Sequence, residues 1–219
     1  MAEKSDAETA ARRYNRAMSK LPSLKASGRL QARRIDTPLG EMLALADQDG
    51  LHLLEFFDRR ELGDEIAALQ ARIKRPIEAG NNVHLETISR ELQSYFEGRE
   101  LAFNVPVVVG GSAFEHDVWI KLQTIPPGQT WSYAQLAECI GNPRAVRAVG
   151  RANGRNCLAV VIPCHRVIGA DGNLCGYGGG LWRKQWLLDH ERKIVGQTTS
   201  TNGQLSLNLS HNGQCAVHE

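Results

Sequence analysis

The segment best suited to chemistry is Cys164-His165-Arg166, which follows an apolar run ending at Pro163. A deprotonated thiol is a strong nucleophile, and imidazole can take up its proton near neutral pH. The β-branched run predicts a buried strand over residues 160–162, which Pro163 ends because proline has no N–H to donate to a sheet. Cys164 is therefore expected where the chain leaves a sheet, beside a cleft. The alternative is an inert buried cysteine, which is the common case.

Other residues near this segment favour a reactive thiol. Asn156 precedes it, a glycine-rich loop begins after Tyr177, and a last predicted helix over residues 182–192 carries Glu191 near its C-terminal end. A cysteine, a histidine and a carboxylate that orients the imidazole form the usual set for thiol chemistry. Neighbouring residues of an extended chain point to opposite faces. We therefore expect Cys164 and His165 to communicate through a water molecule or from a non-extended backbone.

Two capping boxes and a Gly-Asn-Pro turn predict a group of short helices upstream of this segment. Ser112 with Glu115 opens one helix and Ser132 with Gln135 opens another, because each pair satisfies the free N–H groups of a first turn. Gly141 ends the second helix, and Asn142 is predicted to cap a third whose first turn holds Pro143. Two short helices joined by a tight turn predict a helix-turn-helix, although an ordinary helical hairpin fits the spacing equally well.

The third of these helices carries a single-signed stripe. Its spacing of three, four and four residues places four arginines on one face: Arg144, Arg147, Arg151 and Arg155. No acidic residue occurs between Cys139 and Ala170, and alanines such as Ala148 allow close approach to a groove. A charge run is often only a solvated face, but this one favours a helix that lies on nucleic acid.

The N-terminal part of the chain has a different pattern. Short apolar segments between Pro-Leu-Gly and Asp-Gly turns predict an antiparallel meander over residues 30–57, and apolar residues at helical spacing predict helices near 62–73 and 85–96. This part holds no cysteine and only isolated histidines, so we expect no catalytic site in it. Residues 1–28 are predicted to be a helical or disordered arm, and residues 196–219 a disordered tail.

Composition sets broader limits. The 219 residues, 42% hydrophobic and 23% charged, predict a globular protein, and the net charge of +2 is too small to identify a partner. No apolar run approaches the ~18 residues of a membrane span, and the first residues do not look like a secretory signal. Five cysteines without a repeated spacing favour a reducing compartment, so we expect a cytoplasmic protein. We also expect a monomer, with no membrane partner.

Four motifs in the same order match one known family. They are Arg147 to Gly150, Ile162 to Val167, Gly176 to Leu181 and Leu187 to Glu191. Together they resemble the O6-alkylguanine-DNA alkyltransferases, also called methylated-DNA:protein-cysteine methyltransferases, and most closely the bacterial single-purpose members. The resemblance covers Thr37 to about Val195. It implies an α+β protein with a small ribonuclease-H-like α/β domain over residues 29–109 and a mainly helical, DNA-binding and alkyl-acceptor domain with a helix-turn-helix over residues 110–195.

The resemblance also implies a role for each matching residue. Cys164 would accept the alkyl group, His165 would act as its base through water, and Glu191 would orient and charge-balance that histidine. Asn156 would tie the active-site turn, and Tyr133 would assist the departing guanine and help rotate the nucleotide. Arg147 would fill the gap left in the duplex. The remaining assignments are Arg144, Arg151, Ala148 and Tyr133 on the DNA-binding face and Val167, Tyr177, Gly178 and Ala159 in the substrate pocket.

The implied activity is DNA repair by direct, stoichiometric transfer of an alkyl group from O6-alkylguanine, and from O4-alkylthymine, in double-stranded DNA to Cys164. The target base lies inside the duplex, so it must be flipped out, and a stable thioether would leave the protein inactive after one reaction. Small residues at Gly178 and Ala159 predict a roomier pocket that accepts bulkier lesions. No cofactor is expected, and no metal site, because the N-terminal domain lacks the cysteine and histidine ligands of zinc-binding members.

Three other interpretations stay open from the residues alone. A non-catalytic sensor of alkylated DNA would share the architecture, but Cys164 argues against it because such proteins replace that residue. A cysteine hydrolase would need a direct bond between Cys164 and His165. A zinc site is the third, and its ligands would be Cys157, Cys164, His165 and Cys175, which lack paired C-x-x-C spacing.

Overall fold

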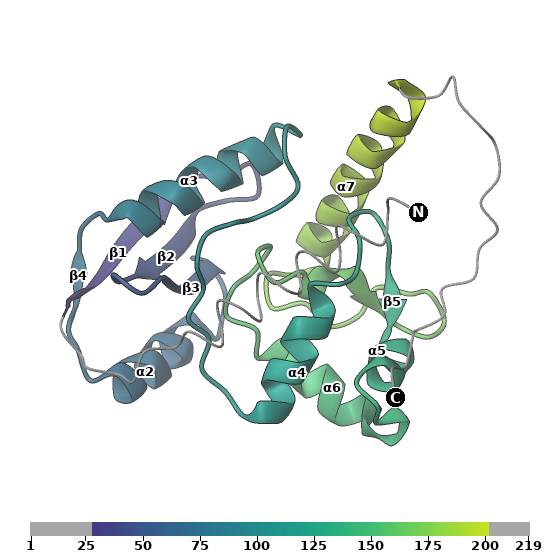
Figure 1. The fold of residues 1–219 in the computed structure, drawn as a ribbon, viewed down its shortest axis with the longest axis horizontal. Helices are drawn as coiled ribbons and strands as arrows, with labels where there is room; N and C mark the ends of the chain where they lie inside the picture. The colour runs from purple at the N-terminus through teal and green to yellow at the C-terminus, as the bar shows by residue number, and fades with distance from the viewer. Residues whose placement is uncertain (1–27, 202–219) are drawn as a thin grey trace.

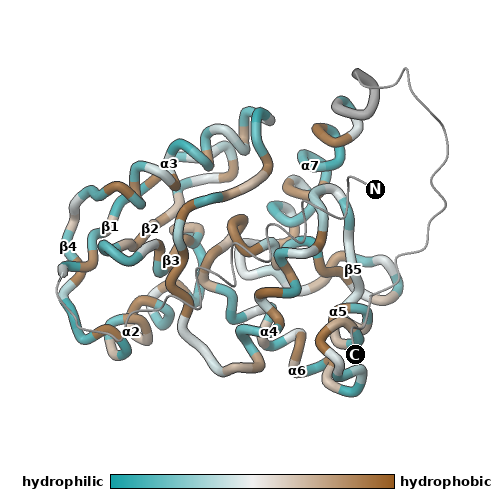
Figure 2. The backbone as a smooth tube through the Cα atoms, viewed as in Figure 1, coloured by the Kyte–Doolittle hydropathy of each residue, from teal (hydrophilic) through white to brown (hydrophobic). Residues whose placement is uncertain are grey.

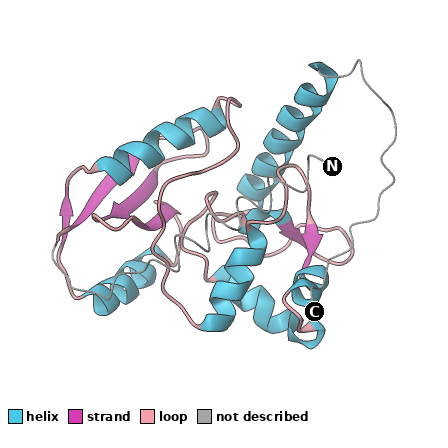
Figure 3. Cartoon of the chain, viewed as in Figure 1, coloured by secondary structure: helices cyan, strands magenta, loops and turns pink. Residues whose placement is uncertain are grey.

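The computed structural model describes residues 28–201 and divides them between a sheet-rich N-terminal half and a mainly helical C-terminal half (Figure 1). The larger sheet belongs wholly to residues 30–79, whereas helices and loops dominate from residue 110 onward (Figure 3). The predicted α+β class is therefore confirmed. No helix among these residues is long and apolar enough to span a membrane. Residues 1–27 of the predicted arm and 202–219 of the predicted tail lie outside the described range.

The N-terminal sheet contains the predicted meander and one further strand. Its strands run in the order β3 (Leu51–Phe56), β2 (Met42–Ala46), β1 (Leu30–Ile35) and β4 (Ile77–Ala79). β1, β2 and β3 pair antiparallel, and β4 pairs parallel with β1. β4 was not predicted because a stretch of three residues, two of them half-buried and one exposed, is too short to show a strand period.

Two helices cover this sheet where the apolar spacing predicted them. α2 (Leu62–Ile73) packs with Leu53 of β3, and α3 (Val83–Phe96) packs with the neighbouring Leu54 in a separate cluster. Successive residues of a strand point to opposite faces, so β3 is buried on both sides. β3 nevertheless carries two polar residues, His52 and Glu55, and α3 alternates between hydrophobic and hydrophilic residues (Figure 2).

The outer edge of β3 is where the two halves join. The N–H of Leu51 donates to the carbonyl of Pro106, and the N–H of Leu54 donates to the carbonyl of Cys157, both at 2.8 Å. The N–H of Ala159 returns a bond of 2.8 Å to the carbonyl of Leu54. An exposed strand edge must be paired or covered. Here the segment just before Cys164 covers it, so the sheet holds that segment in place.

The C-terminal half is built from short helices and a small parallel ribbon. Its elements are α4 (Ala113–Leu122), β5 (Trp131–Ser132), α5 (Tyr133–Cys139), the 3-10 turn η1 (Pro143–Ala145), α6 (Val146–Gly154), the 3-10 turn η2 (Cys164–Arg166), β6 (Val167–Ile168) and α7 (Leu181–Thr201). Both predicted capping boxes are present, at Ser112 and at Ser132. α5 and α6 pack together around a turn at Gly141, whose φ of 74° suits glycine.

Three local predictions in this half were wrong. Asn142 makes no capping hydrogen bond with its side chain, because η1 intervenes and α6 begins only at Val146. Residues 160–162 form a turn instead of a strand, with Val160 at a φ of 70° that no strand allows. α7 runs to Thr201, past residue 196 where the tail was expected, because no proline interrupts it and a lone glycine costs only about 1 kcal/mol. Glu191 therefore lies mid-helix.

Candidate active site

Cys164 opens the 3-10 turn η2, where the backbone is not extended, as the sequence analysis expected for a residue next to His165. Asn156 fixes this turn. Its Nδ2 donates to Sγ of Cys164 at 3.1 Å and to the carbonyl of Ile162 at 2.9 Å, while its Oδ1 accepts from the N–H of Leu158 at 3.0 Å. One buried amide thus holds both the thiol and the strained turn that precedes it.

The buried position of Cys164 controls its protonation. Burial raises the pKa of the Cys164 thiol to about 11, although the hydrogen bond from Asn156 and the charges of Lys184 and Arg59 act in the opposite direction. A neutral thiol is a weak nucleophile. The thiol therefore needs a nearby group that removes its proton when a substrate is present.

His165 is the candidate for that group, and Glu191 fixes its orientation. Nε2 of His165 lies 2.9 Å from Oε1 of Glu191, and both side chains are completely buried. The same carboxylate accepts from Arg166 Nη2 at 2.8 Å, from Tyr95 Oη at 2.9 Å and from the N–H of Gly128 at 2.9 Å. Nδ1 of His165 has no hydrogen-bond partner among the described residues. If Nε2–H donates to Glu191, Nδ1 is the ring atom that can accept a proton.

The charges around Glu191 favour a neutral histidine beside an ionised carboxylate. Burial lowers the pKa of His165, and the attraction of Glu191 only partly opposes this. Burial alone would raise the pKa of Glu191, but His165 and Arg166 more than offset that effect and hold the pKa well below its ordinary value. At neutral pH, Arg166 supplies the positive charge that Glu191 needs, and His165 stays free to act as a base.

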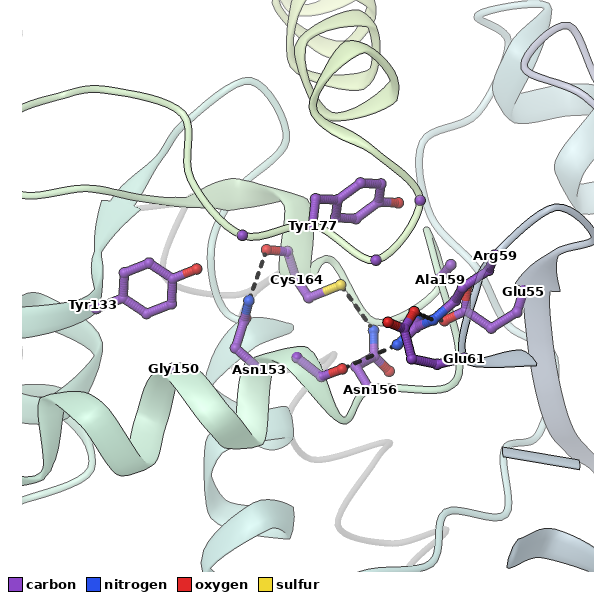
Figure 4. A pocket seen from close by; sticks show the side chains of 14 residues that line it. Glu55, Arg59, Glu61, Tyr133, Gly150, Asn153, Asn156, Ala159, Cys164 and Tyr177 are labelled. Carbon is purple, nitrogen blue, oxygen red and sulfur yellow. Dashed lines mark hydrogen bonds and ion pairs between the residues drawn. The ribbon is translucent and has the colours of Figure 1, made fainter. Parts of the chain in front are cut away.

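Cys164 lines a cavity of about 330 Å³ whose wall comes from both halves of the chain. Tyr133, at the start of α5, lies at one end of this cavity and the pair Glu55 and Arg59 at the other, with Cys164 between them (Figure 4). Burial, followed by the neighbouring thiols, raises the pKa of Tyr133 to about 12, so its hydroxyl stays a hydrogen-bond donor at neutral pH. The remaining wall is formed by Gly150, Asn153, Gly154, Asn156, Ala159 and the loop Gly176 to Gly179, together with Glu61.

Glu55 and Arg59 are residues of the N-terminal domain that line this cavity and were not predicted from the sequence. Nη1 of Arg59 contacts Oε1 of Glu55 at 2.5 Å, and Nη2 contacts Oε1 of Glu65 at 2.8 Å. Burial raises the pKa of Glu55 to about 8 despite the opposing charge of Arg59. The only signal in the sequence was the spacing of four between Glu55 and Arg59, which also fits an ordinary surface pair.

The arginine stripe lies beside this cavity on the outer face of α6. Arg144, Arg147 and Arg151 are exposed and have no ion-pair partner in the described range 28–201. Arg155 differs, because its Nη1 contacts Oε1 of Glu115 at 2.8 Å. The segment from Cys139 to Ala170 holds no acidic residue, but Glu115 reaches Arg155 from α4, which packs on α6. Val149 and Asn153 are buried on the opposite side.

Comparison with known proteins identifies the family. Residues 32–109 match the family model described as the ribonuclease-like domain of 6-O-methylguanine DNA methyltransferase, and residues 113–193 match the model for its DNA-binding domain. A methylated-DNA–protein-cysteine methyltransferase of Shigella flexneri is 41% identical over 169 residues, which cover 76% of this chain and 98% of that protein. The chain belongs to this family.

Further relatives of this methyltransferase agree. A methylated-DNA–protein-cysteine methyltransferase of Methanosarcina acetivorans is 39% identical over 156 residues, or 71% of this chain and 94% of the relative. The crystal structure of Mycobacterium tuberculosis OGT in complex with DNA superposes with a TM-score of 0.65 at 37% identity, covering 75% of this chain and 94% of that one. The methyltransferase is thus an enzyme with a ribonuclease-like domain followed by a DNA-binding domain.

Most of the predicted site residues of the methyltransferase converge in space. Cys164, Asn156, Tyr133, Tyr177, Gly178 and Ala159 all line the cavity. His165 and Glu191 are buried and do not line it, while Arg144 on η1 and Arg147, Ala148 and Arg151 on α6 lie outside it. Val167 does not line the cavity, contrary to prediction. It is fully buried and pairs with Trp131 in the β5–β6 ribbon, while its carbonyl accepts from Lys184 Nζ at 2.5 Å.

Two of the alternative interpretations lose support from this geometry. Within the described residues Sγ of Cys164 bonds to Asn156 and the His165 ring bonds to Glu191, so the direct pair of a cysteine hydrolase is not formed. No group of three or more cysteine, histidine, aspartate or glutamate side chains in the described range could hold a metal ion.

The expected extra room beside Gly178 is absent. A Cβ atom added to Gly178 would lie 2.5 Å from Cζ of Arg59, so the guanidinium already fills the space that a side chain would occupy. The room beside Gly178 therefore depends on Arg59, a residue of the N-terminal domain.

Proposed function

We propose that this methyltransferase repairs double-stranded DNA by transferring an alkyl group from O6 of guanine to Sγ of Cys164, acting once per molecule and without a cofactor. The observation that carries the proposal is the position of Cys164: its sulfur lies on the cavity wall, held by Asn156, with an oriented histidine behind it. The same chemistry applies to O4 of alkylated thymine. We also propose that the protein is a cytoplasmic monomer.

The proposed step balances without a further reactant. The S–C bond forms as the bond between the alkyl carbon and O6 breaks, and the thiol proton passes through a water molecule to Nδ1 of His165. Guanine leaves as it takes a proton, for which the hydroxyl of Tyr133 is the donor available in the cavity. The proton held by His165 then returns through water to the oxygen of Tyr133, so the net change is transfer of the alkyl group to sulfur and of one proton to guanine. The thioether product has no good leaving group, so nothing in the site regenerates the thiol.

Access to the cavity requires that the damaged nucleotide leave the helix stack. Flipping costs a few kcal/mol, and phosphate contacts from an exposed basic face can offset that cost. Arg144 of η1 and Arg147 and Arg151 of α6 form such a face, and Gly150 and Gly154 of α6 line the cavity. We therefore place α6 against the duplex, with the flipped base passing from its outer face to Cys164.

The proposal is tested with duplex DNA that carries one O6-methylguanine with a radiolabelled methyl group. Mixing it with the full chain should move the label to protein in a single turnover, with a stoichiometry of one, and peptide mapping should place it on Cys164. Label that stays on DNA despite tight binding would favour a lesion sensor. Release of label to solvent over repeated cycles would favour a hydrolase.

Replacing Arg147 with alanine should impair repair of duplex DNA far more than reaction with free O6-methylguanine base. Arg147 is exposed on α6 and proposed to fill the gap left by the flipped base. Unstacking costs a few kcal/mol, so losing part of its compensation should slow duplex repair by about tenfold or more. Single-turnover rates on both substrates check this. Arg90→Ala, which removes an exposed arginine of α3, is the control. Equal losses on both substrates would contradict the role.

The rate of alkyl transfer should depend on pH through His165. The pKa of His165 is lowered by burial, so the base stays neutral at neutral pH, and the rate should be flat from about pH 7 upward and fall only in acid. In a His165→Gln variant the thiol must ionise unaided, so the rate should rise about tenfold per pH unit toward the Cys164 pKa of about 11. Single-turnover rates between pH 5 and 10 distinguish the two profiles. If the pH–rate profiles of the original chain and of His165→Gln ran parallel, His165 would not be the base that accepts the thiol proton.

A further inference from the structure

We infer that Arg59, a residue of the N-terminal domain, determines which O6-substituents the pocket accepts. The inference rests on the proposed function, because it concerns the size of the alkyl group delivered to Cys164. Arg59 follows β3 and reaches across the domain boundary into the cavity wall, where its side chain is only 8% exposed. The sulfur of Cys164 opens into the same cavity.

The guanidinium of Arg59 occupies the space that a side chain at position 178 would fill. Atoms Cζ, Nη1 and Nε of Arg59 lie 2.5, 2.6 and 2.9 Å from the position of a Cβ on Gly178, and they are the three atoms nearest to it. Gly178 thus leaves space in the glycine-rich loop, and an arginine from the other domain fills it. The volume of the pocket at this end depends on Arg59.

This wall is rigid because Arg59 is held from several sides. Nη1 contacts Glu55, whose side chain is 1% exposed, at 2.5 Å, and Nη2 contacts Glu65 at 2.8 Å. Nη2 also donates to the carbonyl of Gly154 at the end of α6, at 3.2 Å. Moving Arg59 would break these bonds and leave Glu55 buried without its partner, which is costly. A substituent that needs the space of Arg59 therefore meets a fixed obstacle.

The arrangement of the cavity indicates which substituents these are. Tyr133 lies at one end, Arg59 and Ala159 lie at the other, and Cys164 lies between them (Figure 4). With the guanine ring at the Tyr133 end, a methyl group needs to reach only the sulfur. A benzyl group extends further, toward Ala159 and the guanidinium. The chain should accordingly transfer methyl groups much faster than benzyl groups.

The test compares single-turnover rates on two duplexes that differ only in carrying O6-methylguanine or O6-benzylguanine. The variants are Arg59→Ala and the double variant Glu55→Gln with Arg59→Ala, which removes both charges and so avoids a buried unpaired carboxylate. Arg60→Ala is the matched control, because that neighbouring arginine is exposed and lies outside the cavity. Adding Gly178→Val to the double variant places a side chain in the space that Arg59 had filled.

Removal of Arg59 should raise the ratio of the benzyl rate to the methyl rate by at least about tenfold, because even a small change in pocket volume changes discrimination between substrates by about that factor. Arg60→Ala should leave the ratio within about twofold, and Gly178→Val should bring it back toward that of the original chain. General loss of structure would lower both rates together, so it cannot produce this result. An unchanged ratio in the folded double variant would overturn the inference. Failure of the original chain to transfer either group would instead overturn the proposed function.

Discussion

Replacing Cys164 with serine should abolish alkyl transfer and leave the fold intact. The hydroxyl of serine can still accept the hydrogen bond that Asn156 now gives to Sγ. Because oxygen is smaller than sulfur, serine also fits this buried position, where Cys164 is 6% exposed. An alcohol ionises far less readily than a thiol and attacks saturated carbon poorly, so the transfer rate should fall by about a thousandfold or more. Labelled DNA, mixed with the variant, should keep its label.

Cys157 provides the matched control for this substitution. It is a free thiol next to the same turn, its Sγ lies 3.6 Å from the carbonyl of His52, and burial raises the pKa of its thiol to about 12. Cys157→Ser should therefore transfer the label at nearly the original rate. The Cys164→Ser variant should still bind alkylated duplex, with a melting temperature close to that of the original chain. Label recovered on Cys157 or Cys175 in that variant would refute the assignment of the acceptor.

The contrast between these two cysteines shows where burial alone is uninformative. Cys157 is half-buried next to the β3 edge and Cys164 is buried, and burial raises the pKa of both thiols. Only Cys164 opens into the cavity and receives a hydrogen bond from Asn156. The reactive thiol is therefore distinguished by its neighbours, and several of these could be predicted from motifs near it in the sequence.

The sequence predicted elements whose causes are local. Capping boxes at Ser112 and Ser132 depend on contacts three residues apart, and the meander depends on short apolar segments and glycine turns. The predictions that were wrong concern contacts between segments that lie far apart in the sequence. Residues 160–162 are apolar enough for a strand, but Asn156 and the β3 edge impose a turn instead. That outcome depends on Leu54, more than a hundred residues earlier in the chain.

The same limit applies to the active site. Cys164 could be predicted because it lies in the motif from Ile162 to Val167, and Asn156 and Tyr133 because the family resemblance implies a role for each. Arg59 could not, because nothing near it in the sequence shows that it meets Gly178. The pocket of this methyltransferase is therefore shaped by a contact between domains, and comparing its C-terminal motifs with those of relatives does not determine its size.

Glu191→Ala should destabilise this methyltransferase more than any other single substitution considered for it. The carboxylate is completely buried and accepts hydrogen bonds from His165, Arg166, Tyr95 and Gly128, which belong to three different segments. Its loss leaves the guanidinium of Arg166, only 7% exposed, without a countercharge. Breaking a buried pair in this way costs about 3–5 kcal/mol, a large part of the 5–15 kcal/mol that typically separates folded from unfolded domains.

Chemical denaturation measures this cost, and pH identifies its source. The pKa of Glu191 is held below its ordinary value of 4.5, so the stability it provides is present above that pH and is lost as the pH falls further. The difference in unfolding free energy between the original chain and Glu191→Ala should therefore be greatest near neutral pH and shrink in acid. Asp189→Ala is the control, because Asp189 lies on the same helix in an exposed pair with Arg192 and should change stability by no more than about 1 kcal/mol. A Glu191→Ala difference as small as that of Asp189→Ala would mean that Arg166 and His165 find other partners, and that this carboxylate is not what joins η2, α3 and α7 behind the thiol.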